Sequence, residues 1–184
     1  AGNVASSLWL NYSSSFWEVT QCQWQKRLDP AYDTYGAGPG NYDYFARRDT
    51  TDVAENLAAF ATTGKIKKPL VTVAGTMDAL LPTLHQARAY ADAVAASRKG
   101  DDEHRSAQYR LWEGQNGNHI ENYRNTFPEL EDLQPYAHAA FEALVRHVEH
   151  GERLPPDQCI PRGSGGTIPR RPSEPGRCAE LLVP

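Results

Sequence analysis

Apolar side chains recur at helical spacing in three stretches of the chain. In the longest, residues 137–150, they follow one another at i, i+3, i+4, i+7, i+8 and i+11, and Gly151 ends the pattern. A second helix is expected from residue 53 to Thr63-Gly64, and a third over residues 83–98 with Thr83 as its cap. The third helix should turn one apolar face inward, made of Leu84, Ala87, Ala91 and Val94.

Two short apolar runs between these helices predict strands. Residues 70–74 are continuously apolar rather than alternating, which is typical of a strand covered on both faces in a parallel sheet. The second run, residues 109–112, ends at a cluster of Gly and Asn. The order within residues 50–152, the expected core, is helix, strand, helix, strand, helix. This order predicts an α/β fold with a right-handed βαβ unit, and so small a sheet predicts an incomplete domain.

The segments on either side of this core show neither the apolar spacing of a helix nor that of a strand. Residues 1–49 are rich in aromatic side chains and contain a Gly/Pro cluster, so we expect an irregular cap or lid. Within it, Trp17, Trp24 and Tyr32 are candidates for lining an acyl or aryl pocket, and plain packing is the alternative. Residues 153–184 are rich in Pro and Gly and are expected to form a surface tail without strands.

The composition is that of an ordinary globular protein and narrows the classes of function. A formal net charge of −4 argues against nucleic acid, whose binders usually carry a basic patch. No apolar run approaches the roughly 18 residues of a membrane-spanning helix. Because the chain starts at Ala1 and no leader pattern follows, we expect a processed or excised product whose true start lies upstream.

Three cysteines give an odd count. A Cys159–Cys178 disulfide would close a Gly/Pro/Arg-rich segment that has little other means of holding itself in place. Such a bond favours an oxidising compartment, and hence a secreted or periplasmic protein. Separate reduced thiols are the alternative. Cys22 is then free, or it pairs with a cysteine outside this chain.

Each predicted strand leads into a loop that carries one proton-handling residue. Asp78 ends Gly75-Thr76-Met77-Asp78 after the first strand, and His119 follows a Gly/Asn cluster after the second. Catalytic groups in open α/β sheets lie beyond the carboxyl ends of strands, so we expect the two side chains within hydrogen-bonding distance. A carboxylate would then fix the imidazole in one tautomer, and the imidazole would take a proton from a hydroxyl nucleophile.

Other interpretations compete with this one. Asp78 could cap the helix over residues 83–98, although Pro82 lies between them, and His119 could be a simple turn residue. A catalytic metal is not expected, because no H-E-x-x-H motif or Cys/His cluster is present, and no cofactor is implied. The rival acids and bases are Asp101 and Asp102, in a charged surface turn, and His85, solvated or at the mouth of a cleft.

The run Gly-Thr-Met-Asp-Ala-Leu-Leu-Pro after one strand, with Gly-Asn-His after the next, resembles the C-terminal part of an α/β-hydrolase. That family orders its triad serine, acid, histidine, with the serine in a G-x-S-x-G elbow. Asp78 matches the acid position and His119 the histidine position. The resemblance covers about residues 20–162 and is nearest to secreted bacterial esterases of the tannase, feruloyl-esterase and polyhydroxybutyrate-oligomer-hydrolase kind.

The sequence departs from that family because it contains no G-x-S-x-G. Ser164 follows the histidine and is not an elbow. The resemblance therefore implies a partner, an N-terminal portion or chain that carries the serine and the oxyanion-hole donors. It implies carboxylic ester hydrolysis through an acyl-enzyme, with this chain inactive alone. The alternatives are an amidase or peptidase of the same superfamily, or a non-catalytic binding or cap domain.

Overall fold

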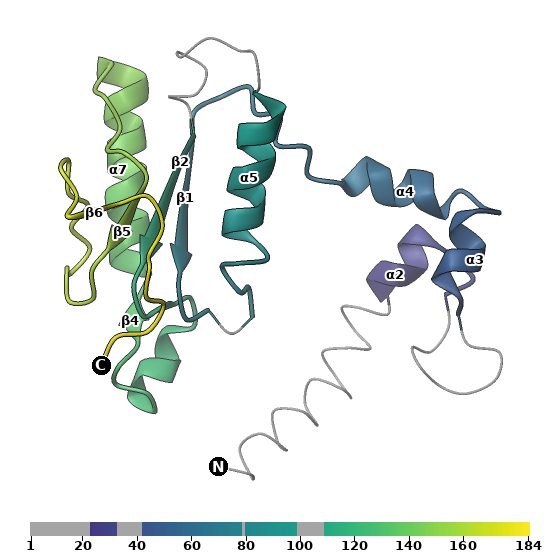
Figure 1. Ribbon diagram of the computed structural model, residues 1–184, viewed down its shortest axis with the longest axis horizontal. Helices are drawn as coiled ribbons and strands as arrows, with labels where there is room; N and C mark the ends of the chain where they lie inside the picture. Colours follow the sequence, from purple (N-terminus) through teal and green to yellow (C-terminus); the bar gives the residue numbers. More distant parts are fainter. Residues whose placement is uncertain (1–22, 33–41, 79, 99–108) are drawn as a thin grey trace. The chain divides into compact units, whose positions relative to one another are not determined.

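The computed structural model describes residues 23–32, 42–78, 80–98 and 109–184 (Figure 1). The chain forms two compact units, Ala1–Ala61 and Thr62–Pro184. The second unit has the predicted α/β class, with a sheet that is mostly parallel. Within the described residues, no helix is long and apolar enough to cross a membrane.

Three short helices make up most of what is described of Ala1–Ala61. Asp43 caps the second of them by accepting the Ala46 N–H at 3.1 Å. Asp29 follows the first helix and is buried, and it accepts hydrogen bonds from the Tyr42 hydroxyl at 2.8 Å and the Arg47 guanidinium at 2.9 Å. A polar contact therefore joins the first two helices. The helices are α2 (Gln23–Leu28), α3 (Tyr44–Arg48) and α4 (Val53–Phe60).

A four-stranded sheet lies at the centre of Thr62–Pro184. β1 (Leu70–Gly75) and β2 (Tyr109–Gly114) pair in parallel along their whole length. β5 (Gln158–Ile160) pairs in parallel with β2, and β6 (Glu174–Pro175) pairs with β5 in the antiparallel direction. The strand order is β1-β2-β5-β6, which makes β1 an edge strand among the described residues. The carboxyl ends of β1 and β2 therefore lie side by side.

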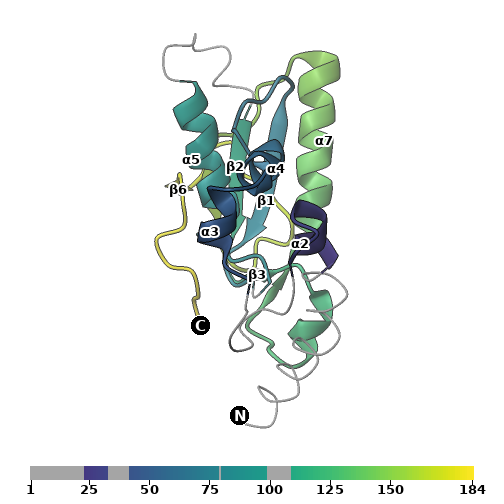
Figure 2. The same ribbon diagram turned by 90° about the vertical axis from the view of Figure 1, so that its right-hand side faces the viewer.

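Two helices cover opposite faces of this sheet (Figures 1 and 2). They are α5 (Ala87–Ser97) and α7 (Gln134–His150). Successive side chains of β2 point to opposite faces, so Leu111 packs with Val94 of α5, whereas Trp112 packs with Tyr136 of α7. Side chains of β1 likewise pack on both faces of the sheet, on the α5 side and on the α7 side. The prediction that this strand is covered on both faces is confirmed.

The end of α4 and the start of α5 differ from the prediction. α4 ends at Phe60, so Gly64 is not its terminal glycine. Gly64 has a φ of +70° and lies against α5, where an added Cβ would come within 2.3 Å of the Ala93 carbonyl, so only glycine fits. α5 begins at Ala87 rather than at Thr83, because residues 83–86 form a turn. Leu84 therefore does not share the apolar face of α5 and is exposed.

The last helix, α7, begins at Gln134, earlier than the predicted residue 137, and ends as predicted at Gly151, which is in the left-handed conformation. Its buried residues are Tyr136 and Ala140. Phe141 and Val148 are exposed, at 68% and 64% of their surface. The broad apolar face expected for this helix is thus only partly covered within the described residues.

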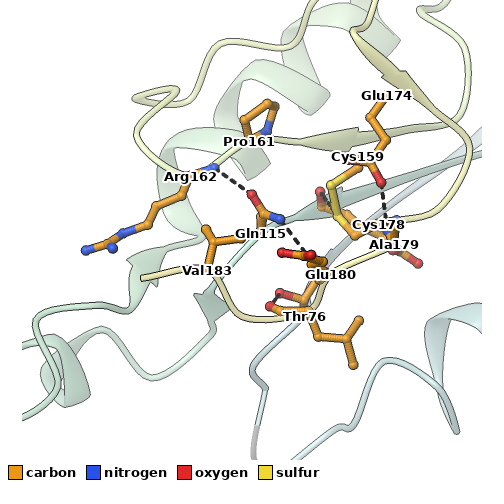
Figure 3. Close-up of a disulfide and its surroundings, with 12 residues drawn as sticks. Thr76, Gln115, Cys159, Pro161, Arg162, Glu174, Cys178, Ala179, Glu180 and Val183 are labelled. Atoms are coloured by element: carbon orange, nitrogen blue, oxygen red, sulfur yellow. Dashed lines mark hydrogen bonds between the residues drawn. A yellow bond between two sulfur atoms is a disulfide. The ribbon is translucent and has the colours of Figure 1, made fainter.

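The C-terminal tail contains two strands that were not predicted. β5 has only three residues, all buried, and a run this short shows no period in the sequence. Cys159 of β5 forms a disulfide with Cys178, as predicted (Figure 3). The tail therefore contributes to the sheet in addition to its exposed turns. The shorter elements between β2 and α7 are β3 (Gly117–Asn118), η2 (Glu121–Asn125) and β4 (Glu131–Asp132).

Candidate active site

The loops that follow β1 and β2 are hydrogen-bonded to each other. The Thr76 N–H donates to the Gly114 carbonyl at 3.0 Å, and the Met77 N–H donates to the Gly117 carbonyl at 3.0 Å. Gly75 permits this close approach, since a Cβ there would come within 2.1 Å of the Gly117 oxygen. The parallel pairing of the two strands therefore extends into the loops that carry the candidate acid and base.

The carboxylate of Asp78 makes contacts on both of its oxygens. Oδ1 accepts the N–H groups of Leu80 and Leu81 at 3.0 and 2.9 Å, which fixes the turn that follows. Oδ2 lies 2.5 Å from Nδ1 of His119. The side chain is only 8% exposed. Asp78 therefore caps a local turn and does not cap α5, which begins at Ala87.

His119 lies between β3 and η2, with its side chain 38% exposed. A proton on Nδ1 would be donated to the Asp78 carboxylate, which leaves Nε2 able to accept another proton. The ring makes no other hydrogen bond to the described part of the chain. The expectation that Asp78 and His119 reach hydrogen-bonding distance is confirmed, and their catalytic role stays a prediction.

Asn118 holds the histidine loop against the aspartate loop. Its Nδ2 donates to the Met77 carbonyl at 3.0 Å, and its Oδ1 accepts the Ile120 N–H at 2.9 Å. The residue is buried, with 4% of its surface exposed. Asn118 was not singled out from the sequence. Its position directly before the histidine was the one available signal.

A pocket of about 630 Å³ opens beside the Asp78–His119 pair. Its lining includes both residues, Leu81, Leu133 and small side chains from β1 and α5. His85 also lines the pocket, and its side chain is exposed to solvent. A space of this size and lining suits a small, largely apolar ligand.

The aromatic candidates for a substrate pocket belong to the other unit. Trp24 is 42% exposed, and its ring centroid lies 5.1 Å from that of Phe60. Tyr32 is buried, with its ring centroid 5.0 Å from that of Tyr42. Their role in binding substrate stays a prediction. The candidate residues that lie outside the described part of the chain are Trp17, Cys22, Asp101 and Asp102.

In the described part of the chain, no serine hydroxyl is hydrogen-bonded to His119. Ser164 follows β5, and its hydroxyl donates to the Pro161 carbonyl. The same residues contain no group of three or more His, Cys, Asp or Glu side chains that could hold a metal ion. Within these residues the Asp78 carboxylate is the hydrogen-bond partner of His119, and the nucleophile expected for the pair stays a prediction.

Comparison with known proteins gives consistent matches. The family model described as 3HB-oligomer hydrolase (3HBOH) matches residues 31–181, which include Asp78 and His119. A D-(-)-3-hydroxybutyrate oligomer hydrolase of Burkholderia thailandensis is 30% identical over 128 residues, 67% of this chain and 16% of the relative. Proteins of the same name from Burkholderia mallei and Burkholderia pseudomallei are 30% identical over 106 residues, 55% of this chain and 14% of each relative. The chain thus spans a small fraction of its relatives' length. No solved structure matches it.

Proposed function

Since this chain belongs to the 3HB-oligomer hydrolase family, we propose that it supplies the acid and the histidine of a serine esterase. The observation that carries the proposal is the 2.5 Å contact between Asp78 Oδ2 and His119 Nδ1, just beyond two neighbouring parallel strands. The serine lies on an N-terminal portion or chain. The assembly of that portion with this chain is called the complete esterase below.

Each residue has a defined part in the reaction. His119 Nε2 takes the proton of the serine hydroxyl as the serine oxygen attacks the ester carbonyl, while Asp78 holds the other proton on Nδ1 and balances the imidazolium charge. The imidazolium then protonates the leaving alcohol, which leaves an acyl-enzyme. Water attacks this ester with His119 again as base, and the acid and the serine are released. General-base action of this kind contributes roughly 10²–10⁴-fold.

The ester that we propose as substrate is a 3-hydroxybutyrate oligomer. The relatives are named as hydrolases of such oligomers. A hydroxy acid polymerises through its own carboxyl and hydroxyl groups, so every junction in the oligomer is an ester. The pocket beside His119, lined largely by small and apolar side chains, suits a short aliphatic chain with one methyl branch in each unit.

The N-terminal portion would complete the sheet as well as the triad. β1 has no neighbour on its outer edge among the described residues, and an unpaired strand edge readily accepts another strand. α7 contacts β1 and exposes Phe141 and Val148. A strand added along β1 and a helix packed on these side chains would bury both surfaces. The proposed whole is an α/β-hydrolase sheet with an interface as large and apolar as a domain interior.

We also propose that the complete esterase is secreted or periplasmic. The Cys159–Cys178 disulfide supports this location, because such bonds persist in oxidising compartments and are rare in the reducing cytosol. Free thiol at both positions in the protein isolated under non-reducing conditions would contradict it.

Labelling of the nucleophile tests the proposal. A serine-directed fluorophosphonate should label the N-terminal portion of the complete esterase and not this chain. The labelled protein should lose hydrolysis of a 3-hydroxybutyrate dimer, and the matching amide should be cleaved far more slowly than the ester. Label on Ser164, label on any other residue of this chain, or no label at all would contradict the proposal.

A further inference from the structure

Residues 178–183, here called the C-terminal strap, run across both loops of the candidate active site (Figure 3). One end of the strap is anchored on the sheet and on α5. Cys178 is bonded to Cys159 of β5. Its N–H donates to the Glu113 carboxylate at 2.8 Å, and its carbonyl accepts from Arg88 at 2.9 Å. The strap therefore leaves the sheet from a fixed point.

Farther along, the strap is bonded to one buried side chain in each loop. The hydroxyl of Thr76, in the loop after β1, donates to the Leu181 carbonyl. The amide of Asn116, in the loop after β2, pairs with Val183 in both directions. Its Nδ2 donates to the Val183 carbonyl at 2.6 Å, and its Oδ1 accepts the Val183 N–H at 2.8 Å. The strap thus bridges the two loops.

Thr76 and Asn116 are also bonded to each other. The Asn116 N–H donates to the Thr76 hydroxyl oxygen at 2.8 Å. Both residues are buried, at 6% and 0% exposure, and Asn116 has a φ of +58°. Thr76 precedes Asp78 by two residues, and Asn116 precedes His119 by three. One hydroxyl and one amide therefore connect the acid loop, the histidine loop and the strap.

We propose that the C-terminal strap positions the active site, with Thr76 and Asn116 as the positioning residues. The inference rests on the proposed function of Asp78 and His119. A displacement of about 1 Å in a catalytic group can cost roughly 100-fold in rate. The bonds from the strap restrain the two short segments that set the spacing of the acid and the base. Loss of these bonds should lower kcat and leave KM nearly unchanged, because neither positioning residue lines the pocket.

Substitution of Thr76 in the complete esterase separates positioning from folding. Thr76→Val keeps the shape of the side chain and removes both hydrogen bonds of the hydroxyl, whereas Thr76→Ser keeps the hydroxyl. Thr83→Val is the matched control, since the Thr83 hydroxyl is buried and has no hydrogen-bond partner among the described residues. A second variant ends the chain after Glu180. It removes the bonds to Thr76 and Asn116 and keeps the Cys159–Cys178 disulfide.

The measurements are kcat, KM, and the rate and final extent of fluorophosphonate labelling. For Thr76→Val and the truncated chain we expect kcat and the labelling rate to fall roughly tenfold or more, with a full final extent of labelling. Thr76→Ser and Thr83→Val should stay within about twofold of the unmodified protein. An unchanged labelling rate in both test variants, at full or at reduced extent, would overturn the inference. No labelling of the unmodified esterase would overturn the proposed function, and this inference with it.

Discussion

Among the described residues, each unit of the chain buries a carboxylate against an arginine, and the surroundings of these two carboxylates differ. Glu113 of Thr62–Pro184 is fully buried, and its two oxygens accept from Arg88 at 2.7 Å each. Asp29 of Ala1–Ala61 is 4% exposed, and its partner Arg47 is 33% exposed. The first pair joins α5 to β2 within a layered fold. The second joins two short helices.

The difference shows that one chemical pair can serve two structural purposes. In Thr62–Pro184 the apolar layers on either side of the sheet form the core, and Glu113 uses its remaining capacity to hold the N–H of Cys178. In Ala1–Ala61 the buried apolar side chains among the described residues are few, namely Leu28, Tyr32 and Val53. There the hydrogen bonds of Asp29 hold the end of α2 against α3. Three experiments test whether the two carboxylates differ in this way.

The largest effect should come from removing the cation in the buried pair. Arg88→Met leaves the Glu113 carboxylate without its partner, which typically costs about 3–5 kcal/mol. Adding Glu113→Met removes the uncompensated charge and should recover most of the loss. Hydrogen exchange of β2 amides in the complete esterase measures both changes. A loss below about 1 kcal/mol for the single variant would show that the pair is not needed in the core.

A somewhat smaller effect is expected from removing the disulfide. Cys159 and Cys178 are 19 positions apart, and closing a loop of about this length is worth about 3 kcal/mol. In the Cys159→Ser/Cys178→Ser variant, faster hydrogen exchange should be confined to Thr62–Pro184, in β5, β6 and the strap. Equal loosening of the α2 and α3 amides would contradict the separation of the two units.

The smallest effect should be a pH dependence confined to Ala1–Ala61. The hydrogen-bonded Arg47 guanidinium lowers the pKa of Asp29 from 3.8 to about 2, with the Tyr42 hydroxyl as a further donor. A pKa depressed by folding gives stability that is complete above about pH 4 and is lost as the pH falls towards about 2.

Pepsin cleavage of the α2–α3 segment measures that dependence. Asp29→Asn should be cleaved faster than the unmodified protein at about pH 4, and the two rates should converge at about pH 2. Arg48→Ala removes an exposed pair with Asp49 and an exposed contact with the Phe45 ring, and it serves as the control, with little change expected. Equal cleavage of Asp29→Asn and the unmodified protein at about pH 4 would contradict an organising role for Asp29.

Periodicity predicted those parts of the fold whose apolar pattern repeats. The helices α7 and α4 could be predicted from their helical period, and the strand at residues 70–74 from its nearly continuous apolar run. The strand at residues 109–112 could be predicted because it is largely apolar and ends at a Gly/Asn cluster. β5 was missed because its three residues are too few to show a pattern, and its burial depends on pairing with β2. Leu84 was misplaced because it fits the helical period, although the chain forms a turn there before α5 begins.

The site could be predicted as far as it depends on loops that follow strands. Asp78 and His119 were named on that basis, and the structure brings them together. The same reasoning could not identify three further residues of the site, namely Thr76, Asn116 and Asn118. They act through hydrogen bonds to backbone groups, and only the folded tail and loops supply those groups. Such contacts join positions up to 105 residues apart and leave no local pattern in the sequence.

We propose His119 as the base of a triad whose serine lies outside this chain. The direct measurement is hydrolysis of a 3-hydroxybutyrate dimer by the complete esterase carrying His119→Ala, with the exposed α7 residue His138 changed to Ala as the matched control. We expect a fall in kcat/KM of roughly 10²–10⁴-fold for His119→Ala, an unchanged value for His138→Ala, and the same unfolding temperature for both. Hydrolysis by His119→Ala within about twofold of the unmodified esterase would contradict it.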